Sequence, residues 1–333
     1  MEEKIKVNIP KNVYEILIKD MELFEFIKPN GSLNKNLFYN TLITNYYQNY
    51  SESEKKIHNT ITDELVNHSN LKTSDIEYIS SLITSKIQKY NLNLTSTKYE
   101  VSISMKPTGL STVAFEYIYN YLLNNSTISS FFRNMFTSYS IKPQNLRERI
   151  IFKNKFDIIN EGILKKKKIF FSYSKDNRRY EVSPYMIANS KEELFNYLLC
   201  SMENQISTFR ITRINKIGLL NTSSSVPLDH RANLDLMSEL GPQFHIALNE
   251  KETVVIRLSE NGKRMFKSIY LHRPTPTKIE NNLYYFDCSY NQLFQYFSRF
   301  GKFAYVLYPK SLRDRIKTFY LEGYNKYEAK KSE

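Results

Sequence analysis

Seven arginine and tyrosine side chains in the middle of the chain are of the types that bind phosphate and stack on bases. The stretch STFRITRINKI carries two arginines among apolar neighbours, with no acid inside it. A planar guanidinium donates parallel hydrogen bonds to a phosphate, and a tyrosine ring offers a stacking face to a base. The candidate ligand- or nucleic-acid-binding residues of this region are Tyr173, Arg178, Arg179, Tyr185, Tyr197, Arg210 and Arg213.

Each of these residues also has a purely structural interpretation. Arg210 and Arg213 are three positions apart in a strand-like stretch, so they face opposite sides unless a bulge intervenes. Either could pair with a distant acid such as Glu181 or Glu193. The two arginines after the KDN turn could simply be solvated, and the tyrosines could be half-buried strand residues. Both interpretations stay open for this set.

A second set of polar residues lies in KIKVNIP at the N-terminus and in KYEVSISMKP near residue 100, where polar and apolar residues alternate. In an antiparallel ribbon the polar side chains would lie on the exposed face, where Lys, Asn and Ser can contact base edges in a major groove. An ordinary ribbon with a polar outer face is the alternative. The DNA-reading candidates are Lys4, Lys6, Asn8, Ser102 and Ser104. Ser32 and Ser126, at expected helix starts, either hold phosphates or only cap.

The positive charge lies mostly in the second half of the chain. The net charge is +13, but residues 1–150 hold 17 Lys and Arg against 15 acids, whereas residues 151–333 hold 30 against 19. Such an excess favours a polyanionic partner. Base composition of the gene is an alternative source of part of it, since A/T-rich codons encode Lys, Asn, Ile, Tyr and Phe.

Other functional classes find little support. The sequence lacks GxSxG, HExxH, Walker and glycine-rich nucleotide motifs, its five histidines are scattered without metal spacing, and its two cysteines have no CxxC partner. We therefore expect no enzyme activity, no cofactor and no metal. No run of eighteen apolar residues occurs, and the N-terminus lacks an apolar signal core. These features predict a cytoplasmic protein without a membrane partner.

Periodicity predicts an α+β chain of several parts. In residues 1–150 the order strand, helix, helix occurs twice, with Val7 and Ile9 matching positions 94 residues later. Residues 151–220 read as short strands separated by turns, which is typical of a small barrel. Residues 221–250 read as a connector. Residues 251–333 have a βαββαβ-like order that fits a ferredoxin-like layer.

The middle segment resembles a WYL domain, a small Sm-like five-stranded barrel of bacterial regulators. The resemblance rests on Tyr173, on VSPY at 182–185, on NYL at 196–198 with Asn196 in place of the family's Trp, and on FRITRI at 209–214. It implies polar ligand contacts around Arg210 and Arg213.

The two ends of the chain show further resemblances. The tail RFGKFAYVLYPKSLRDRI resembles the family's C-terminal extension, which implies a dimerisation domain and a homodimer. The N-terminal repeat resembles a ribbon-helix-helix module. Such a module is normally a dimer because one strand needs a partner, and two copies in one chain could supply both strands.

These features lead to three hypotheses. The first is a DNA-binding transcriptional regulator whose ribbon docks on DNA and whose WYL barrel senses a nucleotide or nucleic-acid ligand. The second is an RNA- or single-strand-binding accessory protein that modulates a CRISPR effector protein, a layout shared by some WYL proteins encoded beside CRISPR systems. The charge distribution favours the second. The third is a sensor of a small anionic ligand in which the barrel has no direct nucleic-acid role.

Overall fold

The protein divides into two compact units, Met1–Asp157 and Ile158–Glu333, in a computed structural model. Eleven α-helices and three antiparallel sheets occur in its described parts, so the fold is mixed α+β. The structure describes residues 4–91, 100–123, 126–174, 176, 178–190, 193–203, 205–242, 253–269, 273–288 and 290–329.

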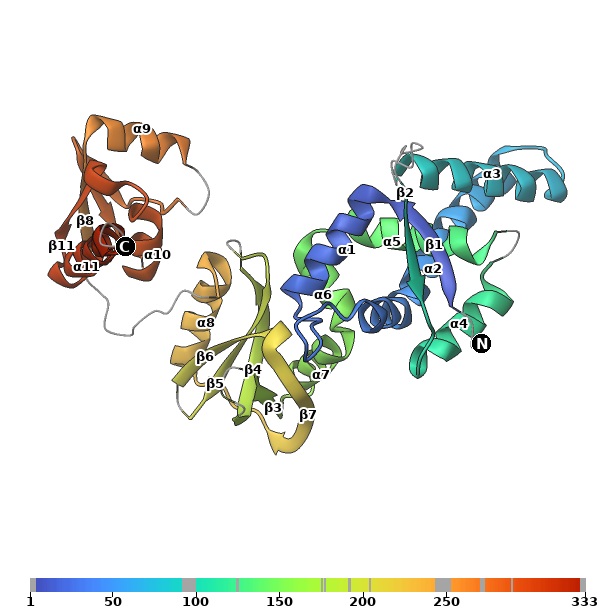
Figure 1. The fold of residues 1–333 in the computed structure, drawn as a ribbon, viewed down its shortest axis with the longest axis horizontal. Helices are drawn as coiled ribbons and strands as arrows, with labels where there is room; N and C mark the ends of the chain where they lie inside the picture. Colours follow the sequence, from blue (N-terminus) through green and yellow to red (C-terminus); the bar gives the residue numbers. More distant parts are fainter. Residues whose placement is uncertain are drawn as a thin grey trace. The chain divides into compact units, whose positions relative to one another are not determined.

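A two-stranded ribbon formed within the chain organises the first unit (Figure 1). Strand β1 (Ile5–Pro10) pairs antiparallel with β2 (Glu100–Met105), and Asn8 lies opposite Ser102. This pairing is the one that the repeat requires. The two strands are equivalent at an offset of 94 residues, so Asn8 lies opposite its own counterpart, Ser102, and the two-fold axis of the ribbon passes between them. The apolar side chains of both strands are buried or half-buried, whereas the alternate side chains of Lys6, Asn8, Ser102 and Ser104 are exposed.

Two helices follow each strand of the ribbon, as the repeat predicts. They are α1 (Lys11–Leu23) and α2 (Lys35–His68) after β1, and α4 (Leu110–Tyr121) and α5 (Ile128–Ser140) after β2. The second helices of the two copies contact each other. The Tyr46 hydroxyl lies 2.9 Å from the Ser138 hydroxyl, and the Tyr39 and Phe136 rings are 6.0 Å apart.

The first copy of the repeat is longer than the second. Helix α2 extends well beyond the matching part of α5, and α3 (Thr73–Asn91) contacts its extension, where His58 Nε2 lies 3.5 Å from the Glu77 carboxylate. The end of α2 and α3 therefore lie between the two copies of the repeat.

A buried ion pair joins the first helix to the end of the unit. The Asp20 carboxylate on α1 is fully buried and accepts two hydrogen bonds, of 2.7 and 2.9 Å, from the guanidinium of Arg147 on α6 (Gln144–Ile151). The Tyr139 hydroxyl donates a third, of 2.7 Å, to the same carboxylate. Burial of the hydroxyl, followed by the nearby Asp20 charge, raises the pKa of Tyr139. The arrangement satisfies a carboxylate that has no access to water.

We expect Asp20→Ala to cost roughly 3–5 kcal/mol of unfolding free energy, because it leaves the Arg147 charge buried without its carboxylate. Urea denaturation followed by circular dichroism measures the loss. The double variant Asp20→Leu/Arg147→Met should lose less than the single variant. Glu15→Ala, which breaks the exposed pair with Lys11, is the control and should cost less than about 1 kcal/mol. Equal losses for Asp20→Ala and Glu15→Ala would contradict this account.

A partly buried lysine lies at the start of α7 (Lys153–Leu164). The Lys155 ammonium lies 4.1 Å from the centre of the Phe152 ring. Burial lowers the pKa of Lys155 to about 8, although the charges of Glu148 and Glu25 act to raise it.

The lowered pKa of Lys155 predicts a pH dependence of stability. Between about pH 8 and pH 10 the unfolded chain keeps the proton that the folded chain has lost, so the free energy of unfolding should rise with pH. Lys155→Met should remove this contribution, whereas Lys19→Met, at an exposed position on α1, should retain it. Urea denaturation at several pH values checks this, and an unchanged slope in Lys155→Met would contradict it.

The second unit begins with a five-stranded antiparallel sheet in the order β6-β5-β4-β3-β7. Helix α7 reaches this sheet closely at Gly162, where a Cβ atom would lie 2.7 Å from the Ile169 side chain. The strands are β3 (Lys167–Tyr173), β4 (Arg179–Asn189), β5 (Asn196–Met202), β6 (Gln205–Arg210) and β7 (Ile214–Ser223).

The predicted closed barrel is not observed. Among the described residues no ladder joins β6 to β7, which are the two edges of the sheet. A single 3₁₀ turn, Ile211–Arg213, connects these edges, so the chain crosses from one to the other without pairing them along their length.

Helix α8 (Leu228–Leu240) lies within the segment expected to be a connector. Its Leu234 and Met237 are buried in a cluster with residues of β4 and β5, and His230 Nδ1 lies 2.9 Å from the Ser201 hydroxyl. The segment therefore contains a helix that covers part of the sheet. Residues 243–250 lie outside the described part of the chain.

The last part of the chain forms a four-stranded antiparallel sheet in the order β11-β8-β10-β9. Along the chain its elements follow the expected βαββαβ order. Its core is rich in aromatic rings, including Phe266, Phe286 and Phe297. The elements are β8 (Val254–Leu258), α9 (Glu260–Ser268), β9 (Lys278–Glu280), β10 (Leu283–Phe286), α10 (Tyr290–Phe297), β11 (Ala304–Tyr308) and α11 (Lys310–Ala329).

Candidate nucleic-acid site on the five-stranded sheet

The hairpin between β3 and β4 positions three of the predicted residues. Tyr173 ends β3, and its backbone N–H donates to the carbonyl of Arg178 over 3.2 Å. The Asp176 carboxylate accepts hydrogen bonds from the Arg178 backbone N–H, over 3.1 Å, and from the Tyr180 hydroxyl. These bonds lower the pKa of Asp176, with the Tyr180 bond the larger cause. These local hydrogen bonds hold the hairpin that carries Arg178 and Arg179 in one conformation.

Aromatic rings gather beside this hairpin. The ring of Phe209 on β6 lies 5.2 Å from Tyr173 and 4.9 Å from Tyr180, both in edge-to-face geometry. Phe171 lies beneath them, 5.0 Å from Phe209. Such edge-to-face contacts hold rings in fixed orientations. Tyr173 is only half-buried, so part of this ordered cluster remains accessible to a ligand.

Arg178 and Arg179 are exposed at the mouth of a cavity of about 430 Å³. Arg179 lies over the Phe170 ring, 4.6 Å from its centre, and donates a 3.0 Å hydrogen bond to Glu181. Because both partners of this ion pair are exposed, it is weak and can be exchanged for a phosphate. The cavity is lined by Arg178, Arg179, Tyr180, Glu181, Met202 and Glu203.

Arg210 and Arg213 do not lie in one continuous strand. Arg210 ends β6, and Arg213 ends the 3₁₀ turn that leads into β7. The Arg210 guanidinium lies 3.2 Å from the centre of the Phe195 ring, and its Nε donates to the Thr212 hydroxyl over 2.8 Å. The Arg213 carbonyl accepts hydrogen bonds of 3.0 Å from the backbone N–H and from the hydroxyl of Ser174. Because the 3₁₀ turn interrupts the strand after Arg210, the alternation expected of one continuous strand does not decide which way the two side chains face.

Tyr185 and Tyr197 make contacts within the fold. The Tyr185 hydroxyl donates a 2.8 Å hydrogen bond to Asp235 on α8, which raises the pKa of the tyrosine. Tyr197 is buried on β5 opposite Arg210, and its hydroxyl donates to Glu193 over 2.5 Å. The structure thus brings Tyr173, Arg178 and Arg179 together at one hairpin, and places these two tyrosines elsewhere on the sheet.

The ribbon of the first unit carries all of its predicted residues on its exposed side. Lys6 lies opposite Ser104 and Asn8 opposite Ser102, while Lys4 directly precedes β1. The Arg133 guanidinium of α5 donates a 2.6 Å hydrogen bond to the Asn8 carbonyl, which ties the ribbon to the helices. This hydrogen bond anchors β1, which carries part of the polar face, to α5.

The two predicted serines do not cap helices. Asn34 caps α2 and Thr127 caps α5, each accepting a hydrogen bond from the backbone N–H three residues later. Ser32 bonds to Asn30, and the Ser126 hydroxyl donates to a backbone carbonyl. The capping prediction is wrong because both serines lie too far upstream of the first helical turn.

Sequence reasoning missed residues beside the β3–β4 hairpin and at the end of the ribbon. Tyr180, Glu181 and Phe209 surround the hairpin arginines, and the alternation of RRYEV, with Arg179 and Glu181 on one face, could have indicated the first two. Lys106 is exposed directly after β2, and continued alternation beyond Ser104 could have indicated it.

Comparison with protein families identifies the five-stranded sheet. The family model of the WYL domain matches residues 154–219. The chain carries a WYL domain. The match spans most of α7 and the strands β3 to β7, and so includes the hairpin arginines and the RITRI turn. Asn196, which stands where the family has Trp, is fully buried at the start of β5 in this WYL domain.

A solved structure resembles the whole chain in fold. A protein described as CRISPR Cas-related is 21% identical, with a TM-score of 0.70 over 99% of this chain and 95% of that one. Proteasome accessory factor B/C of Arthrobacter aurescens is 13% identical, with a TM-score of 0.25 over 65% of this chain and 35% of that one. No curated protein matches the chain.

Membrane-spanning helices and metal-binding clusters are both absent from the described residues. No helix there has the length and apolar character needed to cross a membrane. No group of three or more His, Cys, Asp and Glu side chains in the same residues is placed to hold a metal ion.

Proposed function

We propose that this protein binds single-stranded nucleic acid through its WYL domain and acts as an accessory that modulates a CRISPR effector. The observation that carries the proposal is the pair Arg178 and Arg179, exposed at a cavity beside an ordered aromatic cluster. Two guanidinium groups can hold consecutive phosphates, while the accessible part of Tyr173 offers a stacking face to a base.

The distribution of charge supports this assignment to the second half of the chain. Residues 151–333 hold 30 Lys and Arg against 19 acids, whereas the first 150 residues are nearly balanced. A basic surface attracts phosphates without regard to sequence. The WYL domain lies in this basic half.

The likeness in fold to a CRISPR Cas-related protein supports the biological setting. It covers 99% of this chain, so the likeness extends beyond the WYL domain. The identity of 21% limits this argument to the fold, and the CRISPR role is part of the proposal. The proposal places the protein in the cytoplasm, includes no catalytic step and requires no cofactor.

The proposal includes a finer description of the architecture. The strand order β7-β3-β4-β5-β6, with a 3₁₀ turn before β7, supports an Sm-like sheet for residues 151–220. The order β11-β8-β10-β9 supports a ferredoxin-like domain for residues 251–333, which we propose forms the homodimer. Residues 1–150 would be a tandem ribbon-helix-helix module, since β1 and β2 complete each other within one chain.

We expect Arg178→Ala/Arg179→Ala to weaken binding of a labelled oligouridine and to lower the slope of log K against log salt by roughly 0.7 for each phosphate interaction that the substitutions remove. Fluorescence anisotropy at several salt concentrations measures both quantities. Lys278→Ala, which removes an exposed and ion-paired lysine outside the WYL domain, is the matched control. An unchanged salt slope in the double variant would overturn the role of the hairpin.

Competition with mononucleotides and with duplex DNA separates this proposal from its alternatives. Displacement of the oligouridine by a mononucleotide at similar concentration would indicate a nucleotide sensor. Preference for duplex over single strands would favour a regulator that docks on DNA.

A DNA-binding transcriptional regulator is the second candidate, and the intrachain ribbon specifically favours it. Its exposed face carries Lys6 and Asn8 opposite two serines, in a geometry that fits a major groove. In this case the WYL domain would sense a nucleotide or nucleic-acid ligand.

The second candidate predicts that Lys6→Ala/Asn8→Ala loses discrimination between DNA sequences, by roughly 1–3 kcal/mol for each good base contact. Selection from a random duplex pool, followed by gel-shift measurements with the selected duplex, checks this. Lys11→Ala, at an exposed position on α1, serves as the control. Equal binding by the double variant and the native protein would contradict a reading role for the ribbon.

A further inference from the structure

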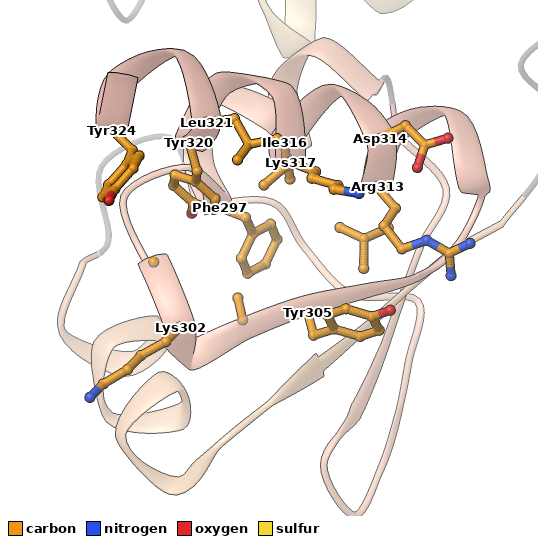
Figure 2. A pocket seen from close by; sticks show the side chains of 13 residues that line it. Phe297, Lys302, Tyr305, Arg313, Asp314, Ile316, Lys317, Tyr320, Leu321 and Tyr324 are labelled. Carbon is orange, nitrogen blue, oxygen red and sulfur yellow. The ribbon is translucent and has the colours of Figure 1, made fainter. Parts of the chain in front are cut away.

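A groove of about 950 Å³ lies between helix α11 and strand β11 of the last domain (Figure 2). Strand β11 is an edge of the four-stranded sheet, so this groove is open on the side away from β8. Its floor is apolar and includes Phe297 and Val306, which are buried, and Ile316, which is half-buried. The size suits a nucleotide or a drug-sized ligand.

Tyrosine rings line the groove from both sides. Tyr305 belongs to β11 and is 53% exposed, while Tyr324 belongs to α11 and is 60% exposed. Tyr320 lies beside Tyr324 on α11 (Figure 2), and its hydroxyl donates a 3.1 Å hydrogen bond to the Ser298 carbonyl, which fixes its ring. Figure 2 shows the exposed rings of Tyr305 and Tyr324 toward opposite ends of the groove, so each is suited to stacking on a separate planar base.

The charged side chains of the groove are mostly cationic. Figure 2 shows Lys302 and Arg313 toward opposite ends of the groove, with Lys317 on α11 between them. Asp314 is the acid among the lining residues. The surrounding residues 253–329 carry thirteen Lys and Arg against six acids, so the local field also favours an anion.

We propose that this groove is a second nucleic-acid site, in which two bases of a single strand stack separately on Tyr305 and Tyr324 and its phosphates contact Lys302 and Lys317. The inference rests on the proposed single-strand binding but concerns a separate place on the chain. An apolar floor, opposed aromatic walls and cations at the rim are the features by which proteins hold single strands without reading sequence.

Charge argues against a second copy of the chain as the occupant. In a two-fold symmetric contact the same surface faces itself, so the cations of one groove would face the cations of the other. Three cations and one acid on each side give net repulsion, whereas a phosphodiester strand supplies the complementary charge.

Variants of the full-length protein test the stacking. Tyr305→Ala/Tyr324→Ala should weaken binding of a labelled oligouridine about tenfold for each base stack that is removed, while leaving the salt slope unchanged. Tyr305→Phe/Tyr324→Phe should bind as the native protein does. Tyr327→Ala is the matched control, because Tyr327 is 81% exposed on the same helix and does not line the groove.

Lysine variants and cross-linking test the location. Lys302→Ala/Lys317→Ala should reduce the salt slope by roughly 0.7 for each phosphate interaction that is removed, with Lys326→Ala as the control on α11. Photo-cross-linking with iodouracil-substituted single strands should label peptides that contain Tyr305 or Tyr324. Oligodeoxythymidine and a mononucleotide, used as competitors, show whether the bound unit comes from RNA, from DNA or from a free nucleotide.

The outcomes separate this inference from the proposed function. Weaker binding in the groove variants with native behaviour of Arg178→Ala/Arg179→Ala supports the groove and overturns the role of the WYL hairpin. Native binding in the groove variants, or cross-links confined to the WYL domain, overturns the groove alone. A change of oligomeric state in Tyr305→Ala/Tyr324→Ala, measured by analytical ultracentrifugation, would show a self-association surface and overturn the inference.

Discussion

The pairing of β1 with β2 is the constraint on which the first unit depends. A single strand leaves its backbone N–H and carbonyl groups without ladder partners, and its apolar side chains need a second layer to cover them. Six residue pairs join the two strands, and the buried side of the ribbon rests on the helices that follow each strand. Since both strands come from one chain, the ribbon is complete without a second molecule.

The environment of each arginine separates structural from available guanidinium groups. Arg147 is buried and bound to Asp20, so its hydrogen-bonding capacity is used inside the fold. Arg210 lies against an aromatic ring and donates a hydrogen bond within the turn between β6 and β7. Arg178 and Arg179 are exposed, and the pairing of Arg179 with a neighbouring glutamate is solvent-screened. The same residue type therefore serves the fold in two places and faces a cavity in a third.

Periodicity of the sequence predicts the elements that have one clear buried face, and it fails where a tertiary contact or one local hydrogen bond decides the structure. The alternation around Val7 and Ile9 identifies the ribbon, because burial dictates that pattern. Helix α8 lies in a segment expected to be a connector, and the sheet against which Leu234 and Met237 pack cannot be foreseen from the segment itself. Asn34 and Thr127 set helix starts by single side-chain bonds. The 3₁₀ turn inside RITRI breaks a pattern that alternation alone extends as one strand.

Composition alone does not distinguish a binding surface in this chain, because Lys and Tyr are abundant throughout. Helix α4 in the nearly charge-balanced first unit also exposes tyrosines, at positions 117, 119 and 121. What distinguishes the α11 groove is that rings and cations line the same apolar cavity. Contacts to phosphate weaken steeply as salt rises, whereas stacking of a base on a ring does not depend on counterion release. A surface that combines both can hold a strand at ionic strengths where a purely basic surface would release it.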